Sequence, residues 1–491
     1  MRDSKKYTAS LFFGLFFSAI LITHAEPGKT GRSEASTGVV VNLSDIHFNP
    51  FYDPSLISSL IASNYTRWQG IFSNSRIQGY GAHNADTNYN LLNSALENIH
   101  RVAPHPDFII ISGDFLSHDF QETYAKLSGR ADPKALDSFI NKTIAFVTST
   151  IVRRFPGTAV YPTLGNNDSY CGDYQLEPSS PFLRETAKAW KIWFKDRFNS
   201  RAFTRTFPTR GSYSIIAPNN RAHRLIVLNT TFFSINYKNT CGDQTADPGH
   251  DEINWFEAEL RKADTRKEKV WLIYHIPPGI DVFATLARKK SGSADQKDEV
   301  IPFWQPAYNQ RFIDLITQYS PIIVGSFAGH IHMDSFELLQ LEANKSLSFV
   351  HITPAISPLF GNNPAFELFS YNRLSFALKD YAVYYFDLSS APAQRHTQVE
   401  WQKEYSFVES YGQPVYAATT LQVVHSLMPG DQRGYLTKYE TYYDVSNMKS
   451  SVVGPANWRA YWCGMTNLKV NQYLRCILPD GLPRQNSNAK R

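Results

Sequence analysis

The stretch Phe108-Ile109-Ile110-Ile111-Ser112-Gly113-Asp114 decides the fold, because it joins a short apolar run to a glycine and a carboxylate. A β-branched run of this length, bounded by glycine, is typical of a buried strand. Polar side chains just past the carboxyl ends of such strands are where open α/β sheets place their functional sites. The glycine lets the backbone turn sharply before the carboxylate. The stretch therefore predicts an α/β fold with a site at the end of a buried strand.

The same arrangement occurs four more times along the chain. The further polar clusters are Asp45-Ile46-His47, Gly165-Asn166-Asn167-Asp168, His275 and Gly329-His330-Ile331-His332. The apolar runs before them cover residues 39–44, 160–164, 270–274 and 321–328. A single Asp-x-His or Gly-Asp is usually a polar pair or an ordinary turn. Five such clusters, each after an apolar run, point instead to one shared site.

These clusters supply seven side chains that can ligate metal ions. Zinc, manganese and iron accept imidazole and carboxylate ligands. Seven ligands are too many for one ion, and they suit two ions that share a carboxylate, an arrangement that typically hydrolyses phosphate esters. The seven are Asp45, His47, Asp114, Asn166, His275, His330 and His332.

In this order the clusters resemble the calcineurin-like metallophosphoesterases and, more narrowly, their acid sphingomyelinase branch. The narrower resemblance rests on residues 113–119, 187–190, 275–279, 329–334, and 353–358 followed by 363–366. It implies an α/β fold in four layers, α-β-β-α, in which a β-sandwich is flanked by helices, with a small C-terminal helical subdomain. We expect the catalytic domain over residues 39–385 and the acid sphingomyelinase-like subdomain over residues 386–491.

The resemblance also implies a role for each ligand. They divide into Asp45, His47 and His332 at one ion, Asn166, His275 and His330 at the other, and Asp114 as the bridge. The ions in this family are usually zinc, with manganese or iron as alternatives. A hydroxide between the ions would attack phosphorus, and His118 would protonate the leaving oxygen.

Asn167 departs from the usual family pattern, in which a histidine follows Gly-Asn and assists the leaving group. Asparagine donates a hydrogen bond but cannot supply a proton as an acid. Either His118 acts alone, or the substrate has a leaving group that needs less help. Fungal endopolyphosphatases of the same branch look similar here, and their phosphoanhydride leaving groups depart as stable anions. We therefore keep Asn167 with His118 as a candidate catalytic residue, and polyphosphate or nucleotides as an alternative to sphingomyelin.

Composition limits the classes of partner. A hydrophobic content of 43% and a charged content of 19% over 491 residues describe a globular protein. The net charge of +5, without long basic runs, argues against binding to a nucleic-acid duplex. We expect a small phosphodiester, a nucleotide, a polyphosphate or a phospholipid head group as ligand. A binding protein that has lost catalysis is the least favoured alternative, because the seven ligands and His118 are present. Oligomeric state is left open.

The N-terminus predicts a cleaved signal peptide over residues 1–25. Basic residues precede an apolar stretch over residues 11–22, and Ala25 offers a small residue for cleavage. A spanning helix needs about 20 apolar residues, so we expect no transmembrane anchor. Residues 26–38 would form a short leader, with no saposin domain before the first strand, which favours soluble substrates. The expected location is secreted, periplasmic or lumenal.

The four cysteines suit an exported protein. They allow three pairings. We expect Cys171 to pair with Cys241 within the catalytic region, and Cys463 with Cys476, a spacing that also resembles a C-terminal disulfide of the family. Zinc ligation by cysteine is less favoured, because the sequence has no Cys-x-x-Cys pair.

Overall fold

The computed structural model describes residues 36–129, 132–242, 246–291, 299–340, 347–390, 399–447, 449–450 and 452–478. The predicted signal peptide and most of the predicted leader lie outside these residues. From Thr37 onward the chain forms one unit. None of the helices in the described ranges combines the length and apolar character of a membrane span.

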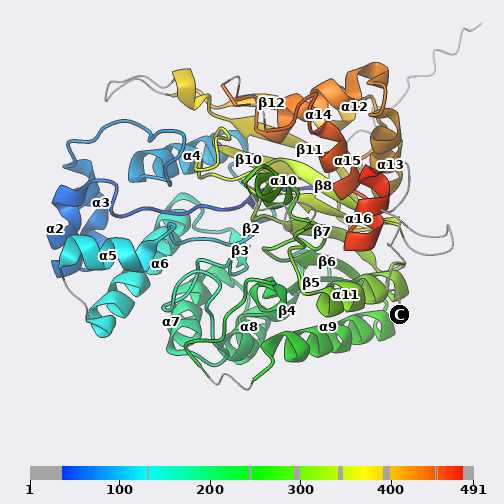
Figure 1. The fold of residues 1–491 in the computed structure, drawn as a ribbon. Helices are drawn as coiled ribbons and strands as arrows, with labels where there is room; N and C mark the ends of the chain where they lie inside the picture. Colours follow the sequence, from blue (N-terminus) through cyan, green and yellow to red (C-terminus); the bar gives the residue numbers. More distant parts are fainter. Residues whose placement is uncertain are drawn as a thin grey trace, which may run out of the picture. The chain divides into compact units, whose positions relative to one another are not determined.

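The first sheet has six strands. Figure 1 labels most of them. Their order is β12 (Gln402–Ser406), β11 (Leu378–Tyr385), β10 (Ala365–Asn372), β1 (Thr37–Leu43), β2 (Phe108–Ile111) and β3 (Ala159–Pro162). β1, β2 and β3 run parallel, whereas β10 and β11 extend the sheet by antiparallel pairing. All four residues of β2 are buried, as expected for a central strand covered on both faces.

The second sheet also has six strands. Their order is β4 (Tyr213–Ile216), β5 (His223–Val227), β6 (Lys269–Ile273), β7 (Ile323–Ala328), β9 (Leu347–Ile352) and β8 (Ser335–Gln340). β5, β6, β7 and β9 are parallel, and the two edge strands are antiparallel to their neighbours. The apolar runs predicted as strands thus correspond to β1, β2, β3, β6 and β7.

The two sheets pack face to face through aromatic side chains. The Phe108 ring in β2 lies 5.8 Å from Trp271 in β6. Phe327 in β7 lies 5.2 Å from Phe369 in β10, with the rings edge to face. These rings are fully buried, and large buried aromatic side chains contribute much of a core's stability. The expected β-sandwich is confirmed.

Helices cover the outer faces of both sheets, which completes the four layers. On the first sheet, α4 (Tyr89–Val102) packs against β10, and α6 (Pro133–Arg154) packs against α4. On the second, α9 (Pro248–Thr265) packs against β5 and α11 (Pro306–Gln318). The other α-helices that the structure describes before the C-terminal region are α2 (Ile57–Ala62), α3 (Trp68–Ser73), α5 (Phe120–Ser128), α7 (Pro181–Trp190), α8 (Arg197–Arg210) and α10 (Val282–Ser291).

Local sequence explains where α9 begins. Asp247 caps the helix by accepting a hydrogen bond from the His250 backbone N–H at 3.0 Å. Pro248 follows at the first helical position, where its missing N–H costs nothing.

The C-terminal region is mostly helical, as expected. Its helices are α12 (Phe407–Tyr411), α13 (Ala418–Leu427), α14 (Tyr435–Tyr443), α15 (Trp458–Gly464) and α16 (Val470–Ile477). The Cys463–Cys476 disulfide joins α15 to α16, as predicted. The region also supplies β12, which the expected helical subdomain did not include and which pairs with β11 at the edge of the first sheet. The boundary at residue 385 stays a prediction.

Candidate metal centre

The predicted ligands come from the carboxyl ends of strands in both sheets. Backbone hydrogen bonds join the loops within each sheet: the Asp45 N–H donates to the Gly113 carbonyl at 3.1 Å, and the Gly329 N–H donates to the His275 carbonyl at 2.9 Å. The His330 N–H from the second sheet donates to Asp45 Oδ2 at 3.0 Å. The centre therefore spans the two sheets rather than one sheet edge.

Asp114 lies between histidines of the two predicted ligand triads. The first triad is Asp45, His47 and His332, and the second is Asn166, His275 and His330. Its Oδ2 is 3.3 Å from His47 Nε2 and 3.2 Å from His275 Nε2. The Asp114 side chain is buried, and burial alone would raise its pKa; the neighbouring imidazoles outweigh this and hold the pKa well below its usual range. An ionised carboxylate between two imidazoles is the arrangement that a bridging ligand requires.

Three histidine side chains also lie close to Asp45 Oδ1. It lies 3.4 Å from His332 Nε2, 3.7 Å from His47 Nε2 and 3.9 Å from His275 Nε2. It is buried without a hydrogen-bond partner among the described residues. A buried polar atom of this kind is rare in native proteins and calls for a ligand or ion. The carboxylate and imidazole donors around it fit a divalent metal ion.

The second predicted triad is less compact. The Asn166 side-chain oxygen faces His275 Nε2 at 3.0 Å. The His330 ring lies 5.1 Å from the His275 ring, and His330 Nε2 is 3.4 Å from the Tyr174 hydroxyl. Burial lowers the pKa of His330 to about 3, so its imidazole is neutral, as a metal ligand must be. These three residues fit a second divalent ion beside Asp114.

Backbone carbonyls orient two of the histidines. The His47 Nδ1–H donates to the Leu116 carbonyl at 2.9 Å, and the His275 Nδ1–H donates to the Ser112 carbonyl at 2.6 Å. Such bonds fix the tautomer and leave Nε2 free to ligate a metal. Both carbonyls belong to the segment that follows β2, so this segment orients predicted ligands from both sheets.

Five of the seven predicted ligands adopt backbone conformations that non-glycine residues rarely adopt. Their φ angles are 49° at Asp45, 40° at His47, 53° at Asp114, 75° at His330 and 65° at His332. Such conformations cost free energy and cluster at functional sites, where the surrounding structure enforces them. Aspartate and histidine adopt positive φ more readily than most non-glycine residues, but the residue type alone does not say which positions will do so.

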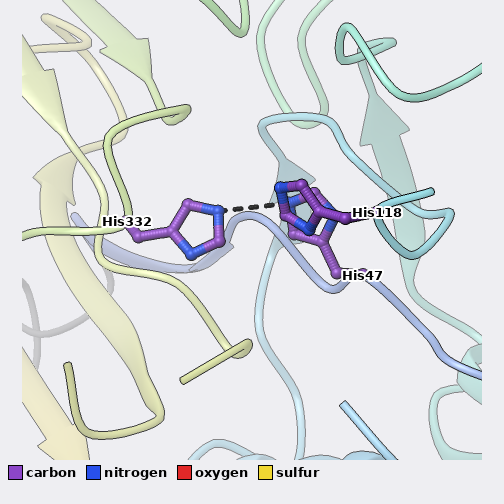
Figure 2. Close-up of side chains that lie close together, drawn as sticks. All are labelled: His47, His118 and His332. Atoms are coloured by element: carbon purple, nitrogen blue, oxygen red, sulfur yellow. Dashed lines mark hydrogen bonds between the residues drawn. The ribbon is translucent and has the colours of Figure 1, made fainter. Parts of the chain in front are cut away.

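His118 lies beside the predicted first triad (Figure 2). Its ring stacks on His47 with centroids 4.0 Å apart, and the His332 ring lies 4.9 Å from His47 and 6.0 Å from His118. The His118 side chain is 28% exposed, whereas His47 and His332 are buried. His118 is thus the histidine of this group that solvent and substrate can reach.

Asp86 orients His118 and was missed by the sequence analysis. Its Oδ1 accepts from His118 Nδ1 at 3.1 Å, and its Oδ2 accepts from the His118 backbone N–H at 2.9 Å. Ser357 Oγ donates to the same carboxylate at 3.0 Å. With Nδ1 engaged, Nε2 is the nitrogen left to exchange a proton. Asp86 precedes the N-cap of a helix, and this position alone gave no functional signal.

Asn167 points at Asp114. Its backbone N–H donates to Asp114 Oδ1 at 2.8 Å, and its side-chain Nδ2 donates to Asp114 Oδ2 at 2.9 Å. The next residue, Asp168, is fully buried and accepts from the backbone N–H groups of Phe115 at 2.9 Å and Gly165 at 2.9 Å. Asp168 therefore fastens the loop after β3 to the loop after β2, a role that sequence reasoning did not assign.

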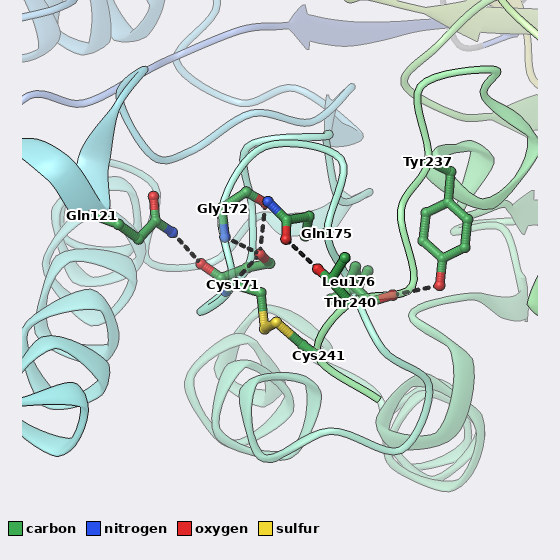
Figure 3. The surroundings of a disulfide bond; sticks show 9 residues. Gln121, Cys171, Gly172, Gln175, Leu176, Tyr237, Thr240 and Cys241 are labelled. Carbon is green, nitrogen blue, oxygen red and sulfur yellow. Dashed lines mark hydrogen bonds between the residues drawn. A yellow bond between two sulfur atoms is a disulfide. The ribbon is translucent and has the colours of Figure 1, made fainter. Parts of the chain in front are cut away.

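The Cys171–Cys241 disulfide holds the loop that follows these residues (Figure 3). This pairing confirms the prediction. Two hydrogen bonds also hold this loop. The Tyr237 hydroxyl donates to the Leu176 carbonyl at 2.9 Å, and the Gln121 side chain donates to the Ser169 carbonyl at 3.1 Å. The same loop carries Tyr174, the neighbour of His330.

A third group of candidate ligands lies elsewhere in the core. Asp334, His351 and Glu367 are buried close together. Their polar atoms already have protein partners: His351 Nε2 meets Glu367 Oε1 at 2.7 Å, and the Tyr405 hydroxyl donates to Asp334 at 2.6 Å. These contacts satisfy the group without an ion.

Comparison with known proteins places this geometry in a family. Residues 38–334 match the calcineurin-like phosphoesterase family, and residues 346–481 match the acid sphingomyelin phosphodiesterase C-terminal region. The human acid sphingomyelinase-like phosphodiesterase 3b is 27% identical over 465 residues, covering 92% of each chain.

Two further relatives are similar over much of their length. The cyclic GMP-AMP phosphodiesterase SMPDL3A of Bos taurus is 28% identical and covers 92% of this chain and 95% of its own. The sphingomyelinase phosphodiesterase D of Dictyostelium discoideum is 29% identical and covers 68% and 67%. The chain therefore belongs to the calcineurin-like phosphoesterase family and carries the C-terminal region of acid sphingomyelin phosphodiesterases.

Proposed function

We propose that this protein is an exported phosphodiesterase that uses two divalent metal ions, with zinc as the expected metal. The observation that carries the proposal is the position of Asp114, whose Oδ2 lies 3.3 Å from His47 and 3.2 Å from His275. A carboxylate shared by histidines of two triads suits a bridge between two ions. Asp45 Oδ1, which has no hydrogen-bond partner within the described part of the chain, supports an ion at the first position.

Each ion would have its own set of ligands. Asp45, His47 and His332 would hold the first, Asn166, His275 and His330 the second, and Asp114 both. Such a pair supplies a water molecule of lowered pKa and neutralises negative charge on the phosphate. The buried ligands and their carbonyl partners keep these side chains in place before substrate arrives, so little reorganisation is needed.

The leaving oxygen would receive its proton from His118. Asp86 accepts from Nδ1 and thereby presents Nε2 to the substrate. The exposure of His118, next to the buried His47, gives it access to a bound phosphodiester. Asn167 would act differently, by holding Asp114 in the orientation that a bridge needs.

Export is supported by the two disulfides, because such bonds persist in oxidising compartments. The predicted signal peptide lies outside the described residues. Mass spectrometry of the protein recovered from a secreting host should give an N-terminus at or near Glu26. A membrane-bound form that retains Met1 would contradict this part of the proposal.

Hydrolysis of nucleotides or polyphosphate at the same site is the second candidate function. The presence of Asn167 favours it, since a phosphate leaving group needs little help from an acid. A relative named as a cyclic GMP-AMP phosphodiesterase favours the first candidate instead, with a nucleotide phosphodiester as substrate.

A panel of substrates on the metal-loaded protein tests these candidates. Bis-p-nitrophenyl phosphate and cyclic GMP-AMP should be cleaved without detergent, and Asp114→Asn should remove most of that activity. If sphingomyelin in vesicles is cleaved and the soluble esters are not, the substrate is a lipid. Cleavage of polyphosphate alone would favour the second candidate over a phosphodiesterase.

A further inference from the structure

A cavity of about 270 Å³ adjoins the candidate metal centre. His330, from the second predicted triad, forms part of its wall. Phe360, which is 46% exposed and contacts the His332 ring edge to face, lines it as well. A phosphoester held at the centre could therefore extend a substituent into this cavity.

The deep walls of the cavity are aromatic. Phe336 comes from β8, Tyr439 and Tyr443 from α14, and Tyr461 from α15. Each of these four side chains is at most 6% exposed. Aromatic faces attract cations that have lost their water, and they also provide apolar contact for methylene groups.

Glu337 introduces an acid into this apolar lining. Its side chain is 5% exposed, and Oε2 has no hydrogen-bond partner among the described residues. Its Oε1 lies against Gly279, where an added Cβ would come within 3.0 Å of it. Burial raises the pKa of Glu337 well above its usual range, since nothing nearby compensates its charge. Burying a carboxyl oxygen that has no hydrogen-bond donor costs free energy, unless a bound ligand supplies that donor.

Asp281 adds a second carboxyl group to the same lining. Its Oδ1 accepts from the Ala284 backbone N–H at 2.8 Å and so begins α10. Burial raises the pKa of Asp281 to about 6. The described residues that line the cavity include neither lysine nor arginine. This lining disfavours a second phosphate and therefore a polyphosphate chain.

We propose that this cavity binds a primary ammonium group carried by one ester substituent of the substrate. The ammonium N–H would donate to Glu337 Oε2, its charge would face Asp281, and its methylene groups would contact the tyrosines. A quaternary ammonium has no N–H and would leave Oε2 without a donor, which is why a primary amine fits better. The inference rests on the proposed function, because it places the phosphoester at the metal centre.

The test compares p-nitrophenyl phosphodiesters whose second substituent is aminoethyl, propyl or choline. The aminoethyl and propyl groups have nearly the same shape and differ in charge and N–H donors. A hydrogen bond to a charged group should raise kcat/KM for the aminoethyl ester over the propyl ester by about tenfold or more. Glu337→Gln should abolish most of that preference, and Asp281→Asn, which keeps a capping side chain, should reduce it.

Glu404→Gln is the matched control. Glu404 is a half-buried acid whose Oε2 is likewise buried and has no hydrogen-bond partner among the described residues, but it does not line the cavity. This variant should keep the wild-type preference. Equal rates for the aminoethyl and propyl esters, or a greater rate for the choline ester, would overturn the inference while leaving the proposed phosphodiesterase intact.

A binding measurement separates the two proposals when turnover is absent. Isothermal titration of the metal-loaded protein with phosphoethanolamine and with propyl phosphate should show tighter binding of the amine, and Glu337→Gln should remove the difference. If the amine binds more tightly but no ester is hydrolysed, the ammonium site is supported and the proposed function is rejected. Equal binding of both ligands would reject the ammonium site.

Discussion

Asn167 donates a hydrogen bond from its side-chain Nδ2 to Asp114 Oδ2 at 2.9 Å. The residue that replaces the family's usual histidine thus contacts the proposed bridging carboxylate. Its contribution should not depend on the leaving group. Asn167→Ala should lower kcat/KM by about tenfold, the value of one such hydrogen bond, for every ester tested. Asn167→His should keep the metal content and raise rates on poor leaving groups. Losses for Asn167→Ala confined to poor leaving groups would show that Asn167 itself assists departure.

His118 should behave in the opposite way, because we assign it the proton for the leaving oxygen. General acid catalysis typically contributes about 10²–10⁴-fold, and its benefit increases with leaving-group basicity. His118→Ala should therefore cost much for alkyl leaving groups and little for nitrophenolate or phosphate. Rates across leaving groups of rising pKa check this. A uniform loss would mean that His118 positions substrate or metal instead.

Asp86 should affect catalysis only through His118, whose Nδ1 lies 3.1 Å from its Oδ1. Asp86→Asn keeps the shape but loses the charge that fixes the imidazole. We expect a smaller loss than for His118→Ala, with the same dependence on leaving group and with KM unchanged. In the double variant with His118→Ala, Asp86→Asn should add nothing. Additive losses would show a role for Asp86 that is independent of His118.

Glu252 should make stability depend on pH. Burial raises its pKa from 4.5 to about 7, while its Oε1 accepts from Ser212 at 2.6 Å. Between these values the unfolded chain releases a proton that the folded protein keeps, so this contribution to stability falls as pH rises from 4.5 to about 7. Glu252→Gln should remove that part of the slope. Chemical denaturation at several pH values measures it, and an unchanged slope would contradict the assignment.

Much of the architecture could be predicted because apolar runs and glycine determine buried strands locally. The carboxyl ends of β1, β2 and β3 meet because these strands are parallel neighbours, and those of β6 and β7 meet for the same reason. Ligand side chains at these ends are therefore brought together by topology. The strand β12 was missed because its sequence, Gln402-Lys403-Glu404-Tyr405-Ser406, is polar, as an edge strand tolerates.

The support of the site could not be predicted. Asp86 reaches His118 across 32 positions of sequence, and Asp168 fastens a loop 53 positions away. Asp86 lies in an ordinary polar stretch, and Asp168 lies in a predicted cluster without a role assigned to it; only tertiary structure brings their carboxylates to the correct loops. The positive φ angles of Asp45 and His47 could not be predicted either, because aspartate and histidine adopt such angles more readily than most residues but do so at few positions.

The central claim is that two metal ions share Asp114, and metal content measured together with activity tests it most directly. Elemental analysis of the purified protein should give about two transition-metal ions per chain. Chelation should abolish hydrolysis of bis-p-nitrophenyl phosphate, and zinc or manganese should restore it. Asp114→Asn should lose at least one ion and most activity, with Glu404→Gln as a folded control that keeps both. Full activity in the metal-free protein, or two ions and full activity in Asp114→Asn, would contradict the account.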